Sequence, residues 1–124
     1  MNNGFELLKK ELRKLENEVL GILLYGSYAK GEETPRSDID ICVVAGFHDK
    51  DKLKALFRKI LPIIGMSEKY DIKIFEYMPL YMKIRVIKEG EPLFVRDLPA
   101  LYEYFYFYLK LWEDQAIVRL KLQD

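Results

Sequence analysis

The stretch that decides the fold runs from residue 20 to residue 45 and reads LGILLYGSYAKGEETPRSDIDICVVA. Residues 19–25 form a nearly continuous apolar run of strand length, which ends at Gly26-Ser27. A second run of this kind covers residues 38–45. Short continuous apolar runs are typical of strands that are buried on both faces. We therefore expect two central strands joined by a loop that begins at the glycine.

The remaining elements follow from hydrophobic periodicity on either side of this stretch. Apolar residues at helical spacing indicate helices, and alternating residues indicate strands. These patterns predict an α/β (α+β) fold, with helices packed on a small mixed sheet. The first expected helix runs from Phe5 to Val19. A second helix has Leu53 to Leu61 on its inner face; Asp49 or Asp51 caps its start, and Pro62 and Gly65 end it. After it we expect a strand over 69–76, a short helix over 79–88, an edge strand over 92–95, and a last helix that begins at Asp97 and Pro99.

The length and composition predict one ordered domain. The 124 residues are enough for a single core, half of them are hydrophobic, and this excludes disorder as the main state. We place the core over about 19–95 and the C-terminal helix over about 98–122. The 20 basic residues balance the 20 acidic ones, which argues against binding of nucleic acid through bulk charge. Cys42 and His48 are single residues of their kind, so neither an internal disulfide nor a Cys/His zinc site is expected.

The same composition bears on location and source. The N-terminus has no basic segment followed by an apolar signal core, and no apolar run approaches the length of a membrane span. We expect a reduced, cytoplasmic protein without membrane contact. Three Asn and two Gln stand beside abundant Lys, Glu and Arg, a balance that predicts a thermophilic source.

Three aspartates lie on expected strands, where acidic residues are rare. Asp38 and Asp40 are two positions apart and therefore project from one face of their strand. Asp71 joins them if its strand pairs beside theirs with Tyr70 and Ile72 on the core face. Two carboxylates about 4 Å apart repel by about 4 kcal/mol at an effective dielectric constant of about 20. A divalent cation reverses this sign, and oxygen ligands without His or Cys favour Mg²⁺ or Mn²⁺.

The loop after the first central strand supplies candidate phosphate ligands. Gly26 permits a tight turn and a close approach of the backbone, and the following residues can expose free N–H groups to an anion. Ser27 can donate a hydrogen bond to a terminal phosphate, and Lys30 can neutralise its charge. Ser37, in the segment that leads into the acidic strand, completes the candidate nucleotide-binding residues. We therefore expect a nucleoside triphosphate as ligand.

Gly26-Ser27, ten residues and then Asp38-Ile39-Asp40 resemble the motif of the DNA-polymerase-β-like nucleotidyltransferases. The string GSYAKGEETPRSDIDI is similar to their minimal (MNT) branch, and the likeness covers roughly residues 20–95. The resemblance implies a nucleotidyltransferase fold, with Gly26-Ser27 on the β- and γ-phosphates of ATP. It also implies two Mg²⁺ ions, or Mn²⁺, held by the catalytic aspartates Asp38, Asp40 and Asp71. Related sequences more often carry Arg at the position of Lys30, and lysine lacks the bidentate fork.

The resemblance also implies an activity and a partner. One ion bound by the three aspartates activates an attacking hydroxyl, the other neutralises the triphosphate, and AMP is transferred as pyrophosphate leaves. The MNT branch is commonly encoded beside a HEPN-domain protein as the antitoxin of a toxin–antitoxin pair, so the implied acceptor is a tyrosine of a HEPN toxin. The alternatives are transfer to a small molecule or an RNA end, and a non-catalytic nucleotide-binding interaction module. The balanced charge and the single domain favour a protein acceptor.

The segment 102–112 is too apolar for a helix that buries one stripe. A small core can cover Leu101, Phe105, Tyr108, Leu109 and Trp112, whereas Tyr104, Phe107 and Leu111 would lie on another face. We expect this second face to bind a HEPN partner or another copy of the chain. A β-hairpin or a buried strand is the alternative, because aromatic residues also favour strands. Asp97 and Pro99 favour the helix.

Overall fold

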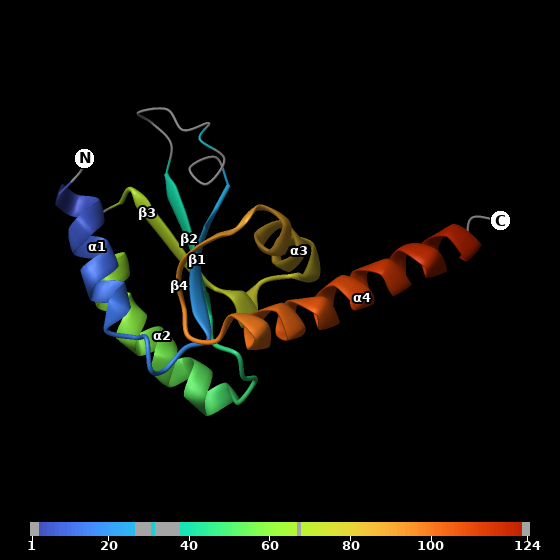
Figure 1. The fold of residues 1–124 in the computed structure, drawn as a ribbon, viewed down its shortest axis with the longest axis horizontal. Coiled ribbons are helices and arrows are strands. Elements are labelled where there is room, and N and C mark those ends of the chain that lie inside the picture. Colours follow the sequence, from blue (N-terminus) through green and yellow to red (C-terminus); the bar gives the residue numbers. More distant parts are fainter. Residues whose placement is uncertain (1–2, 27–30, 32–37, 67, 123–124) are drawn as a thin grey trace.

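Four strands form one mixed sheet between two layers of helices in the computed structural model, which describes residues 3–26, 31, 38–66 and 68–122 (Figure 1). The strand order is β3-β2-β1-β4. In the middle, β1 (Gly21–Tyr25) pairs antiparallel with β2 (Ile39–Val44) and with β4 (Glu91–Val95). The remaining strand, β3 (Tyr70–Ile74), pairs parallel with β2. The predicted mixed sheet, its two central strands and its edge strand at 92–95 are confirmed.

The helices lie in pairs on the two faces of the sheet (Figure 1). The first pair is α1 (Asn3–Arg13) and α2 (Lys50–Ile64), and the second is α3 (Leu80–Glu89) and α4 (Leu98–Leu122). A short 3-10 helix, η1 (Phe75–Tyr77), connects β3 to the second pair. The predicted alternation of helices and strands is therefore confirmed.

Two helix boundaries differ from the prediction. The first helix ends at Arg13 and not near Val19, although Leu15 and Val19 are buried. These apolar residues continue the core in a turn, so their spacing alone could not show where the helix ends. The second helix passes through Pro62 to Ile64. Proline removes one helical hydrogen bond near the end, but the Gly65 N–H still donates to the Leu61 carbonyl at 3.1 Å.

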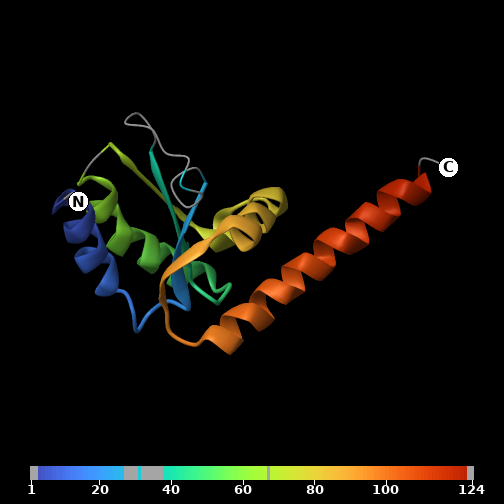
Figure 2. The same ribbon diagram turned by 45° about the horizontal axis from the view of Figure 1, so that its top comes forward.

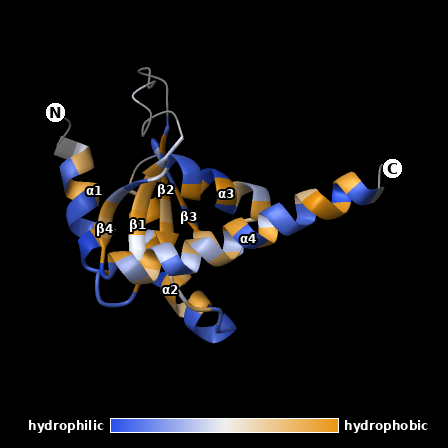
Figure 3. Ribbon diagram, turned by 45° about the vertical axis from the view of Figure 1, so that its right-hand side comes forward, coloured by the Kyte–Doolittle hydropathy of each residue, from blue (hydrophilic) through white to orange (hydrophobic). Residues whose placement is uncertain are grey.

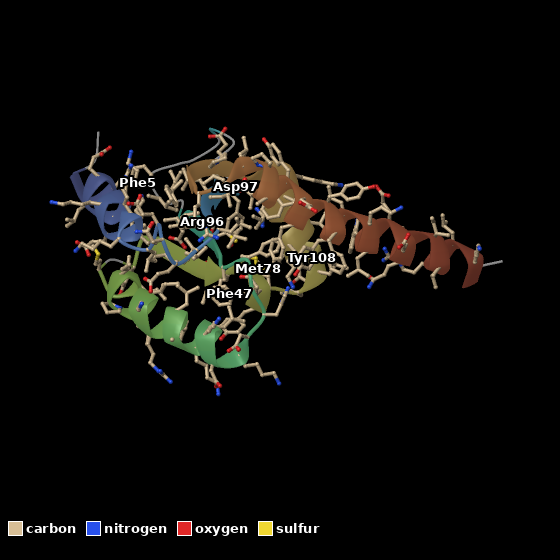
Figure 4. The ribbon with its side chains drawn as sticks, turned by 60° about the horizontal axis from the view of Figure 1, so that its bottom comes forward. Phe5, Phe47, Met78, Arg96, Asp97 and Tyr108 are labelled. Carbon is tan, nitrogen blue, oxygen red and sulfur yellow. The ribbon has the colours of Figure 1, made fainter. Side chains whose placement is uncertain are left out.

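Each face of the sheet has its own core, because the side chains of a strand alternate between faces. In β2, Ile39, Ile41 and Val43 pack toward α1 and α2, whereas Cys42 and Val44 pack toward α3 and α4. The strands are mostly hydrophobic in Figure 3. Figure 4, which labels Phe5 on α1 and Tyr108 on α4, shows side chains of both helix layers packed around the sheet. Asp40 follows the same alternation and faces the α3/α4 layer.

Polar contacts attach the start of α4 to the end of β2. The Glu76 carboxylate accepts hydrogen bonds from the backbone N–H groups of Ala45 and Gly46, at 3.0 Å each. The Tyr104 hydroxyl donates to the same carboxylate at 2.6 Å, and it lies 3.3 Å from His48 Nε2. The prediction that Tyr104 lies on an uncovered face is therefore wrong. It misses Glu76, which lies far away in the sequence and supplies the partner for a half-buried hydroxyl.

The rest of α4 extends beyond the body of the protein (Figure 2). Residues 98–122 are helical, so the alternative of a hairpin or strand is excluded. Within the described part of the chain, no helix has the length and apolar character of a membrane span. Several large apolar side chains of α4 are exposed: Tyr102, Tyr106, Phe107, Leu111, Ile117, Val118 and Leu120.

Candidate active site

The candidate site lies on the α3/α4 face, where β1 ends and where β2 and β3 begin. In the sheet register Asp40 is paired with Tyr25 of β1 on one side and with Asp71 of β3 on the other. Register partners in a sheet project from the same face. The structure thus places the side chains of Asp40 and Asp71 next to each other, as the strand alternation predicts.

The other predicted site residues have different outcomes. Asp38 lies just before β2 and is exposed, and its charge contributes to the raised pKa of Asp40. Gly26 follows β1 directly and touches the site. Ser27, Lys30 and Ser37 lie outside the described residues, so their proposed contacts with the nucleotide remain predictions.

The environment of Asp40 disfavours its negative charge. Burial raises the pKa of the Asp40 carboxyl, and the neighbouring Asp71 carboxylate raises it further. The cations of Lys73 and Arg85 lower the same pKa, but the rise prevails. The carboxylates of Asp40 and Asp71 therefore repel each other, and a bound positive charge would relieve this repulsion.

Lys73 balances part of this charge. Its Nζ lies 2.9 Å from Asp71 Oδ2, and both side chains are 43% exposed. The two residues are two positions apart on one strand and so share a face. The alternation already places Lys73 beside Asp71, but nothing in the sequence singles out this lysine as their partner in an ion pair.

Arg85 approaches from α3, and the sequence analysis missed it. Its Cζ lies 5.9 Å from the centre of the Tyr25 ring, and its Nε is 3.0 Å from Glu89 Oε2. Ion pairs one helical turn apart on a helix stabilise by only about 0.3–0.5 kcal/mol. The helical pattern of the sequence does not distinguish Arg85 from other exposed basic residues, because its distance from Asp40 depends on how α3 packs on the sheet.

Gly26 allows the backbone to pass close to Asp40. Its φ angle is +77°, which side-chain-bearing residues rarely adopt. A Cβ atom at this position would lie 2.5 Å from Asp40 Oδ2. Both the backbone conformation and the space therefore require glycine, and the carboxylate occupies the place where a side chain would be.

Tyr25 brings a buried polar group to the same face. The residue is 1% exposed, and its hydroxyl has no hydrogen-bond partner among the residues that the structure describes. Burial raises the pKa of this hydroxyl, and the charge of Asp40 raises it further, so it stays protonated and able to donate. A buried donor without a partner destabilises a protein by about 1–3 kcal/mol. The hydroxyl is therefore a hydrogen-bond donor available to a group beyond the described residues.

A divalent metal ion fits the chemistry of this face. Asp40 and Asp71 offer the hard oxygen donors that Mg²⁺ and Mn²⁺ prefer, and a cation would relieve their repulsion. Within the described ranges, no three carboxylate, imidazole or thiol groups are already arranged as a metal site. Lys73 holds Asp71 instead, so a metal ion would compete with this ammonium group for the carboxylate.

Comparison with known sequences identifies the family of this chain. Residues 6–98 match the family described as polymerase beta, nucleotidyltransferase. A protein of Methanocaldococcus jannaschii, described as a protein adenylyltransferase, is 48% identical to this chain over 99 residues. The matched segment covers 79% of this chain and 73% of that protein.

Solved structures share the fold at lower identity. A chain from a toxin–antitoxin complex with AMP-PNP has a TM-score of 0.67 and 22% identity, and the match covers 99% of this chain and 97% of that one. A second match comes from a complex of tri-AMPylated Shewanella oneidensis HEPN toxin with an MNT antitoxin. Its TM-score is 0.64 at 17% identity, over 96% of this chain and 95% of that one.

Replacing Gly26 tests the close approach to Asp40. Gly31 also has a positive φ, +72°, but a Cβ there would meet nothing within 4 Å. We expect Gly31→Ala to lower the free energy of unfolding by about 1–2 kcal/mol through backbone strain alone. Gly26→Ala should lower it by about 1–3 kcal/mol more, because the new methyl group displaces the carboxylate. Urea denaturation measures both; equal losses would contradict the steric role of Asp40.

The raised pKa of Asp40 predicts a dependence of stability on pH. Where the folded pKa is the higher one, the stability that protonation contributes is present below the unfolded pKa, about 3.9, and is lost as pH rises through the folded pKa. Asp40→Asn keeps this side chain neutral. The Tm of the variant minus that of the native protein should therefore increase from about pH 3 to about pH 7 in EDTA. Thermal denaturation gives the difference, and a flat or falling one would contradict the raised pKa.

Proposed function

The chain belongs to the polymerase beta nucleotidyltransferase family, and from this premise we propose that it transfers AMP from ATP to a hydroxyl acceptor and releases pyrophosphate. The observation that carries the proposal is the pairing of Asp40 with Asp71 beside Gly26. Nucleotidyl transfer needs positive charge at this place, because the triphosphate, the attacking oxygen and the leaving pyrophosphate are all anionic.

Divalent metal ions are general in this family, and the residues present fit them. Asp40 and Asp71 would hold the catalytic ion, with Asp38 contributing from the residue before β2. When bound, Mg²⁺ lowers the pKa of the attacking hydroxyl and neutralises the triphosphate. Two ions, as in the predicted scheme, and the choice between Mg²⁺ and Mn²⁺ are part of this proposal.

The chain's own residues have separate tasks in the reaction. Gly26 lets the backbone approach the phosphates, and Ser27 and Lys30 are proposed to bind them. Asp71, at the edge of the sheet, faces the acceptor and holds the hydroxyl in line with the α-phosphate. The hydroxyl oxygen then forms a bond to this phosphorus, the bond to the pyrophosphate oxygen breaks, and the hydroxyl proton passes to solvent or to Asp71.

We propose that the acceptor is a tyrosine of a HEPN-domain protein, which the transfer silences. Support comes from similar proteins: a protein adenylyltransferase at 48% identity, and a complex that contains an AMPylated HEPN toxin. An apolar groove of about 260 Å³ also opens beside the site and includes Lys73, the ion-pair partner of Asp71. Its other lining residues include Phe57, Tyr77, Met78 and Met82, a surface suited to a polypeptide.

The exposed apolar side chains of α4 are proposed to bind this partner. Tyr102 and Tyr106 are each 62% exposed and lie one turn apart on the helix. The base of α4 is fastened to the sheet through Glu76 and Tyr104, so the helix presents these rings from a fixed support. Homo-oligomerisation through the same helix is the alternative.

Substitution of the aspartates tests the proposed activity. We expect Asp38→Ala and Asp40→Ala to abolish transfer of label from α-labelled ATP in the presence of Mg²⁺, because each removes a carboxylate that would hold the metal ion. The labelled product, analysed as polypeptide, RNA or small molecule, identifies the acceptor. Asp49→Ala, in the cap of α2 away from the site, is the matched control and should retain transfer.

Circular dichroism distinguishes loss of activity from loss of fold in these variants. Unchanged transfer by a folded Asp40→Ala protein would contradict the assigned role. No transfer by the native protein to any acceptor would favour the non-catalytic interaction module.

The proposed partner surface has a test of its own. We expect Tyr106→Glu to weaken co-purification with the HEPN-domain protein of the same genome by about 10-fold or more, because it places a charge in an apolar contact. Tyr81→Glu is the control, since Tyr81 is a 64% exposed tyrosine on α3. Titration by calorimetry gives the two affinities, and size-exclusion chromatography of the chain alone detects homo-oligomers. Equal affinities would exclude this surface.

A further inference from the structure

We propose that Arg85 of α3 and the Tyr25 hydroxyl bind phosphate oxygens of ATP, as ligands additional to Ser27 and Lys30. This inference rests on the proposed function and extends it, because neither side chain belongs to the motif that suggests the activity. The expected substrate class is a nucleoside triphosphate, and the arginine is assigned to its β- and γ-phosphates.

The first argument is position. The space that the missing side chain of Gly26 leaves open is flanked by Asp40 Oδ2 and by Arg85 Nη2, which lie 2.5 and 3.5 Å from the place of a Cβ atom. The Asp40 carboxylate and the Arg85 guanidinium therefore both lie beside Gly26, where the proposed phosphate-binding loop begins. A phosphate group beside Gly26 would lie within reach of this guanidinium.

The second argument is availability. Arg85 is half exposed and pairs with Glu89 one turn along the same helix. Such a surface pair holds its members weakly. A phosphate group offers the planar guanidinium two parallel hydrogen bonds and more negative charge than a single carboxylate. Arg85 can thus exchange Glu89 for a triphosphate.

The third argument is the Tyr25 hydroxyl. It is buried, it lacks a partner among the described residues, and the charges that act on it include those of Asp40, Asp71 and Arg85. A protonated hydroxyl in this place can donate to a phosphate oxygen, which has no proton of its own. The Tyr25 ring also lies under the Arg85 guanidinium, at 5.9 Å, so the two groups face the same space.

The fourth argument is charge balance. Without ligands, Lys73 and Arg85 offset the charge of Asp40. When divalent cations neutralise the carboxylates, both basic side chains lose part of their attraction to them. Lys73 projects from β3 beside Asp71, on the proposed acceptor side, whereas Arg85 lies next to Gly26. Arg85 is therefore the cation placed for the triphosphate.

Calorimetric titration with MgATP and with AMP tests the role of the arginine. We expect Arg85→Gln to raise the Kd for ATP about 10-fold or more and that for AMP less than about 3-fold, because AMP lacks the β- and γ-phosphates. Arg85→Lys should recover part of the ATP affinity, since it keeps the charge without the fork. Lys88→Gln, which removes an exposed cation from the same helix, should leave both values within about 2-fold.

The tyrosine has a test with two opposite readouts. Tyr25→Phe should weaken ATP binding about 5-fold or more, while the Tm of the ligand-free protein stays equal or rises because an unpaired buried hydroxyl is removed. A hydroxyl with a purely structural partner would give the reverse: a lower Tm and unchanged ATP affinity.

The outcomes separate this inference from the proposed function. ATP binding by the native protein with unchanged affinity in Arg85→Gln would overturn the role of Arg85 and leave the proposed activity in place. Equal losses for ATP and AMP would also overturn it, because the arginine would then act on the site as a whole. Failure of the native protein to bind ATP would overturn both proposals.

Discussion

The parallel pairing of β2 with β3 is the constraint on which the site depends. It places Asp40 and Asp71 at the same level on one face of the sheet, where their charges repel and where burial disfavours ionisation. The surrounding residues compensate in different ways. Lys73 binds one carboxylate directly, and Arg85 acts on the other from a neighbouring helix. A bound cation would relieve this repulsion between the two carboxylates.

The two faces of the sheet therefore have different tasks. The face under α1 and α2 is covered by a continuous apolar core, which stabilises the fold. The opposite face has two parts. A second core lies under α3 and the first turns of α4, and the polar site lies at the end of the strands. Stability and chemistry share one sheet because side chains alternate along each strand. Ile39 and Ile41 support the fold from the same strand that presents Asp40 to the site.

The long helix α4 carries the surface proposed for a partner. Its first turns are held by the buried rings of Phe105 and Tyr108 and by the hydrogen bond from Tyr104 to Glu76. Beyond them the helix extends from the body with apolar side chains exposed (Figure 2). A helical segment with exposed apolar side chains is stabilised when another surface covers it. The architecture thus separates the proposed binding of a partner from the chemistry on the sheet.

The amino-acid sequence by itself determined the strands, their alternation and the chemical nature of the site. The apolar run before Gly26 and the spacing of Asp38 and Asp40 suffice for this, because strand periodicity is a local property. Local periodicity could not determine where the first helix ends, which residue binds the Tyr104 hydroxyl, or that Arg85 lies beside Asp40. These facts arise only when α3 and α4 pack on the sheet, since each joins residues far apart in the chain. Only the tertiary structure places Asp40 beside Asp71 and brings Arg85 to them.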